Sequence, residues 1–263
     1  QNHEPTLQAA FVDIGADRNA FLHYWDMLPA AQHLARQAER DRRRGDGKKP
    51  TGLFRRLLNS LGPDSPPPPP ETDQDPTSEP EPRRIPLEEI PKLFPRGSDL
   101  VVQVSKGPIG SKGARVTTNL SIPGRYLVLL PYESTTAVSR KIEDREERHR
   151  IRDVLSGLDN PSQAGFICRT NAEGADPECF RRDANLLLEL WREIGEKSTK
   201  SRAPAILYQE PDLVEQILRD LFTTAIDEVV IDDTETWKRA REFVSRHIDP
   251  ELAKRITLYQ KAR

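Results

Sequence analysis

Apolar and polar residues alternate along two parts of the chain, which is the pattern of half-buried β-strands. Residues 8–25 alternate on both sides of Gly15-Ala16-Asp17, so we expect two strands joined by a turn. Residues 99–131 form a second β-rich region, in which glycine-punctuated turns separate the apolar runs. Together these regions predict a small β-rich domain.

After Pro131 the apolar spacing changes to that of amphipathic helices alternating with short strands. This alternation predicts an α/β unit with a largely parallel sheet, and a mixed α+β fold for the whole chain. The expected helices are residues 142–158, 177–197, 212–223 and 235–247. The expected strands are residues 165–170, 205–209, 227–231 and 255–259.

A long insertion, residues 29–95, interrupts the β-rich region. Its first part, to about residue 49, has the composition of a polar helix and contains Arg42-Arg43-Arg44. Residues 62–95 hold 12 of the 23 prolines together with many acids, so this part cannot bury a core. We expect it to be disordered or in polyproline-II conformation, and we read the arginine run as a solvated face.

Composition limits the classes of protein to which this chain can belong. Of the 263 residues only 35% are hydrophobic and 31% are charged, and the net charge of −2 hides lysines and arginines clustered around the glycine turns. Cys168 and Cys179 have no CxxC partner, which argues against a zinc site or a disulfide framework and favours a reducing, cytoplasmic setting. No apolar run is long enough to span a bilayer, and no signal peptide is present. The start at Gln1, inside a β-rich domain, suggests a fragment.

Basic and aromatic residues near the glycine turns are suited to a nucleic acid. Lys106, Lys112 and Arg115 lie at loop tips or beside them, with hydroxyl groups close by, as in surfaces that bind polyanions. Strand alternation places Phe21 and His23 on one face, where a ring can stack on an unpaired base. From periodicity alone Phe21 is a core residue, and stacking is the alternative. Trp25 is assigned to the core, and an auxiliary RNA contact is the alternative role for the arginine run in the insertion.

Two further groups could carry chemistry. Arg169-Thr170 ends a buried strand and offers a guanidinium fork and a hydroxyl to phosphate oxygens. From the residues alone an ion pair of the arginine with Glu173 or Asp176 is the favoured interpretation. Asp232-Asp233 follows another strand, a place where α/β enzymes hold magnesium. We interpret this pair as a strand-end turn and a helix cap before Thr234.

Three long motifs resemble the N-terminal half of the ribonuclease E/G family of bacterial endoribonucleases. They are AAFVDIGADRNAFL at residues 9–22, KGPIGSKGARVTTN at residues 106–119 and ICRTNAEGA at residues 167–175. The resemblance implies that Phe21 and His23 belong to an S1 motif facing RNA. It also implies a pocket for the 5′-monophosphate of RNA, formed by Gly124, Val128, Arg140, Arg169 and Thr170. Lys141 stands where arginine is commoner in the family.

The resemblance also implies a domain organisation. Residues 1–118 would form an S1-type barrel of the oligonucleotide-binding class, residues 119–204 a 5′-phosphate sensor, and residues 205–263 part of a ribonuclease-H-like subdomain. The family cleaves single-stranded RNA in rRNA processing and mRNA decay, using Mg²⁺ held by aspartates of a DNase-I-like module that this sequence lacks. We therefore expect no catalytic and no metal-binding residue in this chain.

The same family resemblance implies a cytoplasmic, homo-oligomeric parent enzyme without integral membrane association. Two other classes of protein remain open on the sequence. One is a non-catalytic RNA-binding protein, or a truncated paralogue that occupies 5′ ends without cutting. The other is a metal-dependent enzyme that uses Asp232 or Asp233 locally.

Overall fold

The computed structural model describes residues 2–4, 7–34, 85–160, 162 and 164–259. The chain divides into two compact units. The first comprises Gln1–Leu120 with Arg202–Ala205, and the second comprises Ser121–Ser201 with Ile206–Arg263. Each unit combines strands with helices, so the expected mixed α+β class is confirmed. The division into three functional domains stays a prediction.

The first unit is built on one five-stranded sheet with the order β1-β2-β3-β5-β4. Neighbouring strands are antiparallel except β3 and β5, which run parallel. The strands are β1 (Asn2–Glu4), β2 (Ala9–Val12), β3 (Ala20–His23), β4 (Gln103–Lys106) and β5 (Arg115–Thr117). β1 and β4 remain the two edges of the described sheet, which is not closed, so the expected barrel is not confirmed.

One face of this sheet is apolar and buried. Ala10 is paired with Leu22 across β2 and β3, and both side chains are fully buried, as is Val116 on β5. Residues at odd and even positions of a strand point to opposite faces, so the neighbours of these residues are displayed on the other side. The strand pair predicted around Gly15 is confirmed.

The assignment of Trp25 to the core was wrong, because 61% of its surface is exposed. Strand alternation stops at His23, where the 3-10 helix η2 (Tyr24–Met27) begins. The His23 ring caps this helix by accepting a hydrogen bond from the Trp25 N–H. The turn sends Tyr24 and Met27 into the core in place of Trp25.

The last part of the insertion is folded, and not disordered as predicted. The 3-10 helix η3 (Leu87–Glu89) and the short helix α3 (Ile90–Leu93) lie within it, and Ile90 and Phe94 are fully buried. These two side chains anchor the segment to a core, so residues 85–95 are not a solvated excursion. Helical structure begins at residue 28, close to the expected start, and residues 35–84, with the arginine run and the proline run, lie outside the described residues.

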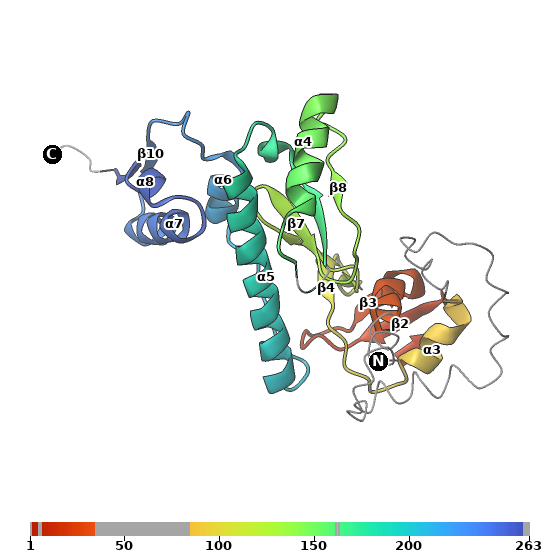
Figure 1. The fold of residues 1–263 in the computed structure, drawn as a ribbon. Helices are drawn as coiled ribbons and strands as arrows, with labels where there is room; N and C mark the ends of the chain where they lie inside the picture. The colour runs from red at the N-terminus through yellow and green to blue at the C-terminus, as the bar shows by residue number, and fades with distance from the viewer. Residues whose placement is uncertain (1, 5–6, 35–84, 161, 163, 260–263) are drawn as a thin grey trace, which may run out of the picture. The chain divides into compact units, whose positions relative to one another are not determined.

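The second unit contains a four-stranded sheet with the order β6-β7-β9-β8, in which β8 and β9 run parallel. Its helices α4 and α5 lie beside this sheet (Figure 1). The strands are β6 (Ile122–Pro123), β7 (Leu127–Leu130), β8 (Ala137–Val138) and β9 (Gly165–Cys168). The helices are α4 (Arg145–Ser156), the 3-10 helix η4 (Thr170–Ala172) and α5 (Pro177–Lys200). The two predicted helices and the β9 strand are confirmed.

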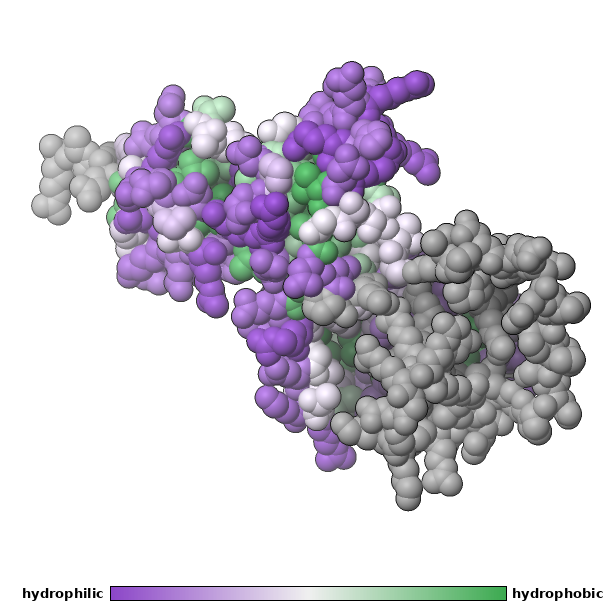
Figure 2. Space-filling view, in the orientation of Figure 1, coloured by the Kyte–Doolittle hydropathy of each residue, from purple (hydrophilic) through white to green (hydrophobic). Residues whose placement is uncertain are grey.

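One face of the four-stranded sheet packs into the main core of this unit. Leu127 and Cys168 are paired across β7 and β9 and are fully buried, with Phe166 on the same face. Phe180 and Leu187 on α5 complete this core. The outward faces of α4 and of the region formed by α7 (Thr234–His247) and α8 (Pro250–Ala253) are hydrophilic (Figure 2), as expected of amphipathic helices.

The C-terminal part of the second unit has its own small core. The strands β10 (Val229–Ile231) and β11 (Ile256–Leu258) pair in parallel, as the alternation of strands and helices predicted. The helices of this part are α6 (Leu213–Leu221), α7 (Thr234–His247) and α8 (Pro250–Ala253). Two described strands do not establish a ribonuclease-H-like fold, which stays a prediction. The sequence analysis did not anticipate α8.

The strand expected at residues 205–209 does not form. Leu207 and Tyr208 are half-buried and pack against the main core of the second unit through their side chains. Their backbone joins no sheet, so the apolar character of this segment reflects burial of side chains and not strand pairing. This prediction was wrong.

A buried carboxylate organises the turn between β6 and β7. Asp183, on the apolar face of α5, accepts hydrogen bonds from the backbone N–H groups of Arg125 (3.1 Å), Tyr126 (2.8 Å) and Leu127 (2.8 Å). Burial raises the pKa of Asp183, and these three donors act against that rise because they favour the ionised form. The turn is therefore wrapped around one side chain of a distant helix.

Gly124 makes this arrangement possible. A Cβ atom at this position would lie 2.6 and 2.7 Å from the two carboxylate oxygens of Asp183. No side chain fits there without moving the carboxylate away from the turn. The φ of Gly124 is not in the left-handed region. A glycine is therefore required by the close approach of the Asp183 carboxylate and not by the backbone conformation.

A second carboxylate fixes the loop that follows β9. Glu147 on α4 accepts two hydrogen bonds from the guanidinium of Arg150, both 2.7 Å, and one of 2.9 Å from the backbone N–H of Gly174. The bonds from Arg150 and from Gly174 lower the pKa of Glu147 from 4.5 to about 2. α4 therefore holds the far end of the loop that contains Arg169 and Thr170.

We predict that Gly124→Ala destabilises the protein by about 1–3 kcal/mol, because the added methyl group overpacks a site that is already filled. The matched control is Gly195→Ala, since a Cβ at Gly195 in α5 would meet no atom within 4 Å. That substitution should stabilise the helix by about 0.5–1 kcal/mol. Urea unfolding of the three proteins measures both changes, and equal stability of the two variants would contradict the role of Gly124.

We predict that Glu147→Gln lowers stability mainly above pH 4.5. The depressed pKa of Glu147 means that its contribution is complete above the ordinary value of 4.5 and is lost as the pH falls toward 2. The difference in unfolding free energy between wild type and variant should therefore shrink between pH 6 and pH 3.5. Glu146→Gln, at an exposed neighbouring position, is the control and should show no such convergence.

Candidate functional site

The face of the five-stranded sheet opposite the buried one carries aromatic rings. Phe11 on β2 is paired with Phe21 on β3, and their ring centroids lie 6.0 Å apart in an edge-to-face arrangement. The His23 ring follows at 6.4 Å from that of Phe21. All three side chains are half-buried, so each ring presents part of its surface to solvent. Phe21 lies opposite the buried face and not in the apolar core that periodicity alone suggested.

Hydrogen bonding fixes the orientation of His23. Its Nδ1 accepts from the Trp25 N–H at 3.2 Å, so in the neutral ring the proton is on Nε2. The side chain that caps η2 therefore also offers a donor on the exposed face. This hydrogen bond holds the His23 ring beside the ring of Phe21.

Arg115 extends the aromatic face toward β5. Its register partner across the parallel pair is Phe21, and its guanidinium pairs with Asp26 at 3.0 Å. Half of the Arg115 side chain is exposed in spite of this ion pair. The Thr117 hydroxyl also donates to Asp26, at 3.3 Å. The arginine is thus held beside the rings in a fixed position.

Lys106 and Lys112 stand at the two ends of the loop between β4 and β5. Lys106 is opposite Arg115 across an irregularity in the ladder. Backbone bonds in both directions between Ile109 and Lys112 close a tight turn, at which Gly110 has a φ of 56°. Both lysines are exposed and have no carboxylate partner within the described part of the chain. We call the surface formed by Phe21, His23, Lys106, Lys112 and Arg115 the aromatic–basic face.

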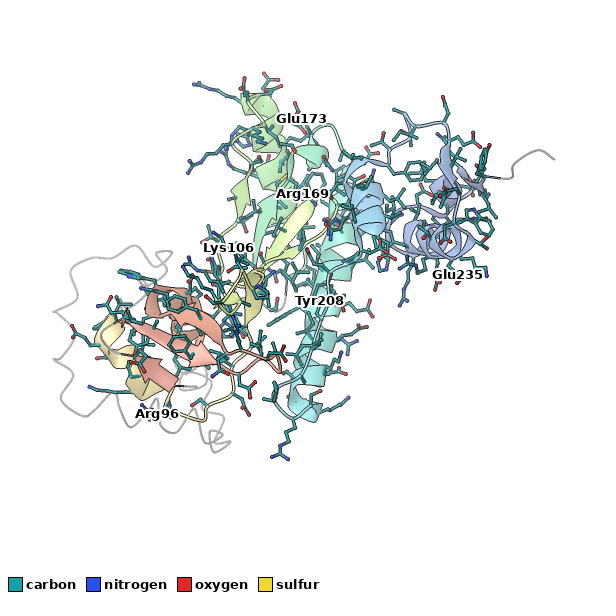
Figure 3. The ribbon with its side chains drawn as sticks, turned by 180° about the vertical axis from the view of Figure 1, so that it is seen from behind. Arg96, Lys106, Arg169, Glu173, Tyr208 and Glu235 are labelled. Atoms are coloured by element: carbon teal, nitrogen blue, oxygen red, sulfur yellow. The ribbon has the colours of Figure 1, made fainter. Side chains whose placement is uncertain are left out.

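In the second unit, Arg169 directly follows strand β9. Its backbone N–H donates to the carbonyl of Tyr126 at 2.8 Å, which continues the β7–β9 pairing by one residue. Its Nη1 atom donates to the Gly124 carbonyl at 2.5 Å and to Asp220 Oδ1 at 2.9 Å. Figure 3 labels the Arg169 side chain. Gly124 and Arg169, which the sequence placed in one pocket, are therefore in direct contact.

Thr170 and Arg140 lie at the same end of the sheet. Val138 on β8 is paired in parallel with Cys168 on β9, and the Ser139 N–H donates to the Cys168 carbonyl at 3.0 Å. Arg140 and Thr170 each lie two residues beyond this pair, in a turn and in η4 respectively, and both are exposed. Arg148 on α4 fixes this turn by donating to the carbonyls of Ser139 and Ile142.

Val128 lies farther inside the sheet. It is paired with Ile167 on β9, and Ile167 is paired with Ala137 on β8. All three are half-buried on the face opposite the main core. Arg169 is two residues beyond Ile167 on the same strand, so its side chain leaves the backbone on this same face. We call Gly124, Arg140, Arg169 and Thr170 the arginine site, with Val128 on the adjoining sheet surface.

The sequence analysis missed the acidic partner of Arg169. Neither Glu173 nor Asp176 forms the ion pair that was considered; Asp220 near the end of α6 does. Arg219 donates to the same carboxylate at 2.9 Å, and Asn171 donates to the Asp220 carbonyl at 2.7 Å. The only sequence signal was an Arg-Asp pair ending an amphipathic helix, which does not reveal a partner 51 residues away.

Asp233, the second residue of the Asp232-Asp233 pair, is the N-cap of α7. Asp233 caps α7 by accepting from the Thr236 N–H at 2.8 Å, and this bond lowers its pKa, so the interpretation as a helix cap is confirmed. Within the described residues no group of three His, Cys, Asp or Glu side chains could hold a metal ion.

Both cysteines are free thiols. Cys168 is buried, and burial raises the pKa of its thiol to about 12, so it stays protonated at neutral pH and is a poor nucleophile or ligand. Cys179 is half-buried and is also a free thiol. Of the helices that the structure describes, none combines the length and the apolar character needed to cross a membrane.

Comparison with known proteins gives the same family as the three sequence motifs. The sequence model of the Ribonuclease E/G family matches residues 121–263, more than half of the chain. Ribonuclease G of Haemophilus influenzae is 32% identical over 255 residues, which cover 97% of this chain and 43% of that protein. Ribonuclease G of Escherichia coli strain K12 has the same identity and coverage. Ribonuclease E of a Nostoc species is 36% identical over 155 residues, 59% of this chain and 22% of that protein.

The match extends over both compact units and includes the aromatic–basic face and the arginine site. The chain spans less than half the length of the curated relatives it matches. The resemblance suggested by the three motifs is confirmed, and the chain belongs to the ribonuclease E/G family.

Proposed function

We propose that this chain is the RNA-binding and 5′-monophosphate-sensing part of an endoribonuclease. The proposal rests on which hydrogen-bond donors of the Arg169 guanidinium are occupied by the protein and which are not. Its Nη1 atom is occupied by Gly124 and Asp220, whereas its Nε and Nη2 atoms have no partner within the described residues. A guanidinium edge of this kind is the donor pair that binds two oxygens of a phosphate.

The neighbours of Arg169 suit a terminal monophosphate. The exposed Thr170 hydroxyl has no hydrogen-bond partner in the described chain, and the exposed Arg140 follows β8 at the same end of the sheet. A phosphate monoester carries about −1.5 to −2 charges and three accepting oxygens, which matches two guanidinium groups and one hydroxyl. The Arg169 side chain is only 24% exposed, and we expect a bulky triphosphate to reach its Nε and Nη2 atoms less easily than a monophosphate.

The aromatic–basic face supports binding of single-stranded RNA. The strand order, with one parallel pair and two free edges, is compatible with a partly open five-stranded barrel of the oligonucleotide-binding type. Such barrels bind through strands 2 and 3 and the loop between strands 4 and 5. Here those elements carry Phe21 and His23, and the two lysines of the loop. Rings stack on bases while the cations contact phosphates.

The activity of the whole protein is part of the same proposal. We infer that it cleaves single-stranded RNA in rRNA processing and mRNA decay, in the cytoplasm, as a homo-oligomer that uses Mg²⁺. The described carboxylates do not fit a magnesium site, so no chemical step is assigned to them. The role of these residues is to bind the RNA and to recognise its 5′ end.

We predict that Lys106→Ala and Lys112→Ala each weaken binding to every single-stranded RNA sequence. Each loss of a phosphate contact should lower the slope of log affinity against log salt by about 0.7. Fluorescence anisotropy with unstructured RNAs at several salt concentrations measures this slope. Lys92→Ala, an exposed position on α3, is the control and should leave the slope unchanged.

Phe21→Ala in the same titrations separates stacking from charge. It should cost about 1–3 kcal/mol of binding free energy with little change in the salt slope. Unfolding of this variant would show instead that Phe21 acts as a core residue. Unchanged affinity of both lysine variants would remove the RNA role of the β4–β5 loop.

We predict that the chain binds 5′-monophosphorylated RNA more tightly than the same RNA with a 5′-hydroxyl or a 5′-triphosphate. Arg169→Ala and Thr170→Val should abolish this preference and leave internal binding intact, because only the terminal phosphate loses its donors. Arg181→Ala, an exposed arginine on α5, should keep the preference. Equal affinity of the folded wild-type chain for all three ends would refute the sensor.

A further inference from the structure

Asp220 lies at the centre of a small ionic network in the arginine site. Its Oδ1 atom accepts from Arg169 Nη1 and from Arg219 Nε, both at 2.9 Å. Arg219 also donates to the Pro123 carbonyl at 3.2 Å. One carboxylate therefore joins two guanidinium groups to the turn between β6 and β7.

The hydrogen-bond count shows what Asp220 does to Arg169. The Nη1 atom of a guanidinium has two protons, and here one goes to the Gly124 carbonyl and the other to Asp220. Two acceptors on one nitrogen fix the rotation of the planar group. The opposite edge, with Nε and Nη2, is left to face a ligand.

The place of Asp220 is itself fixed by backbone contacts. Arg125 donates to the carbonyls of Phe222 at 2.6 Å and Arg219 at 3.3 Å, which caps the end of α6. Asn171, next to Thr170, donates to the Asp220 carbonyl. The end of α6 is therefore tied both to the turn that contains Gly124 and to the loop that contains Thr170.

The charge of Asp220 also favours its contacts with two guanidinium groups. Burial acts to raise its pKa, but the hydrogen bonds from Arg169 and Arg219 outweigh burial and lower it, so the group is ionised at neutral pH. Its charge offsets one of the two guanidinium charges of Arg169 and Arg219. The three side chains Asp220, Arg169 and Arg219 together keep one net positive charge.

We propose that Asp220 is a positioning residue that determines the specificity of the arginine site for a 5′-monophosphate. The inference rests on the proposed 5′-end sensing. Asp220 touches Arg169 and not the ligand, and it acts by holding the guanidinium with its free edge toward the phosphate. Without this second acceptor the side chain rotates about its remaining bond to Gly124 and loses the paired geometry.

Three substitutions of Asp220 separate geometry from charge. Asp220→Asn retains an oxygen acceptor and removes the charge, Asp220→Ala removes both, and Asp220→Glu retains the charge but moves it by one methylene. The readout is the ratio of affinities for 5′-monophosphorylated and 5′-hydroxyl RNA of identical sequence, with folding checked by thermal unfolding. Asp227→Ala, an exposed acid outside the network, is the control.

We expect Asp220→Asn to keep the wild-type ratio, and Asp220→Ala and Asp220→Glu to lower it to the value of Arg169→Ala. An unchanged ratio in Asp220→Ala or Asp220→Glu would overturn the inference. Equal losses in Asp220→Asn and Asp220→Ala would also overturn it, because charge alone would then be responsible. If Asp220→Ala does not fold, the comparison of Asn with Glu decides.

A wild-type ratio of one has a different meaning. It would refute the 5′-end sensing itself, before any substitution of Asp220 is considered. A wild-type ratio above one that every Asp220 variant retains would leave the sensing intact and refute only the positioning role. The two failures are therefore distinguishable in one set of titrations.

Discussion

The second unit depends on the buried carboxylate of Asp183 and the three backbone N–H groups that it binds. A buried carboxylate is unfavourable unless its oxygens are hydrogen-bonded, and the turn after Gly124 supplies the donors. Because the N–H groups of this turn face Asp183, the carbonyls of Pro123 and Gly124 are left for other donors. Arg219 and Arg169 take them. A constraint in the core thus determines which way the arginines of the site point.

Arginine side chains serve mainly as connectors in this structure. Arg125, Arg148 and Arg219 each donate to backbone carbonyls at turns or at helix ends, where such groups lack partners within their own element. Arg169 shares this pattern on one edge only. Like Arg148, it has no partner for Nε and Nη2 within the described residues, but its Nη1 atom also binds a carboxylate, that of Asp220.

Periodicity predicted most helices and strands but not their partners. The stripe Phe180, Ala184 and Leu187 identified the buried face of α5, yet it did not explain why Asp183 lies on that face. The motif at residues 167–175 located Arg169 and Thr170, whereas Asp220 became visible only through contact across 51 residues. The predictions for residues 205–209 and for Trp25 were wrong for a related reason. Hydrophobicity indicates that a side chain favours burial, and it does not show which backbone bonds or turns surround it.

The parallel register of β8 and β9 has a consequence for how this part of the chain can vary in length. Val138 and Cys168 are aligned, and the residues that follow them carry the exposed groups Arg140 and Thr170. Removing or adding one residue within β9 would exchange its two faces and turn Arg169 into the core. The connection between α4 and β9 can change in length without altering that alignment. Insertions and deletions among homologues should therefore accumulate before Gly165 and be absent from Gly165 to Thr170.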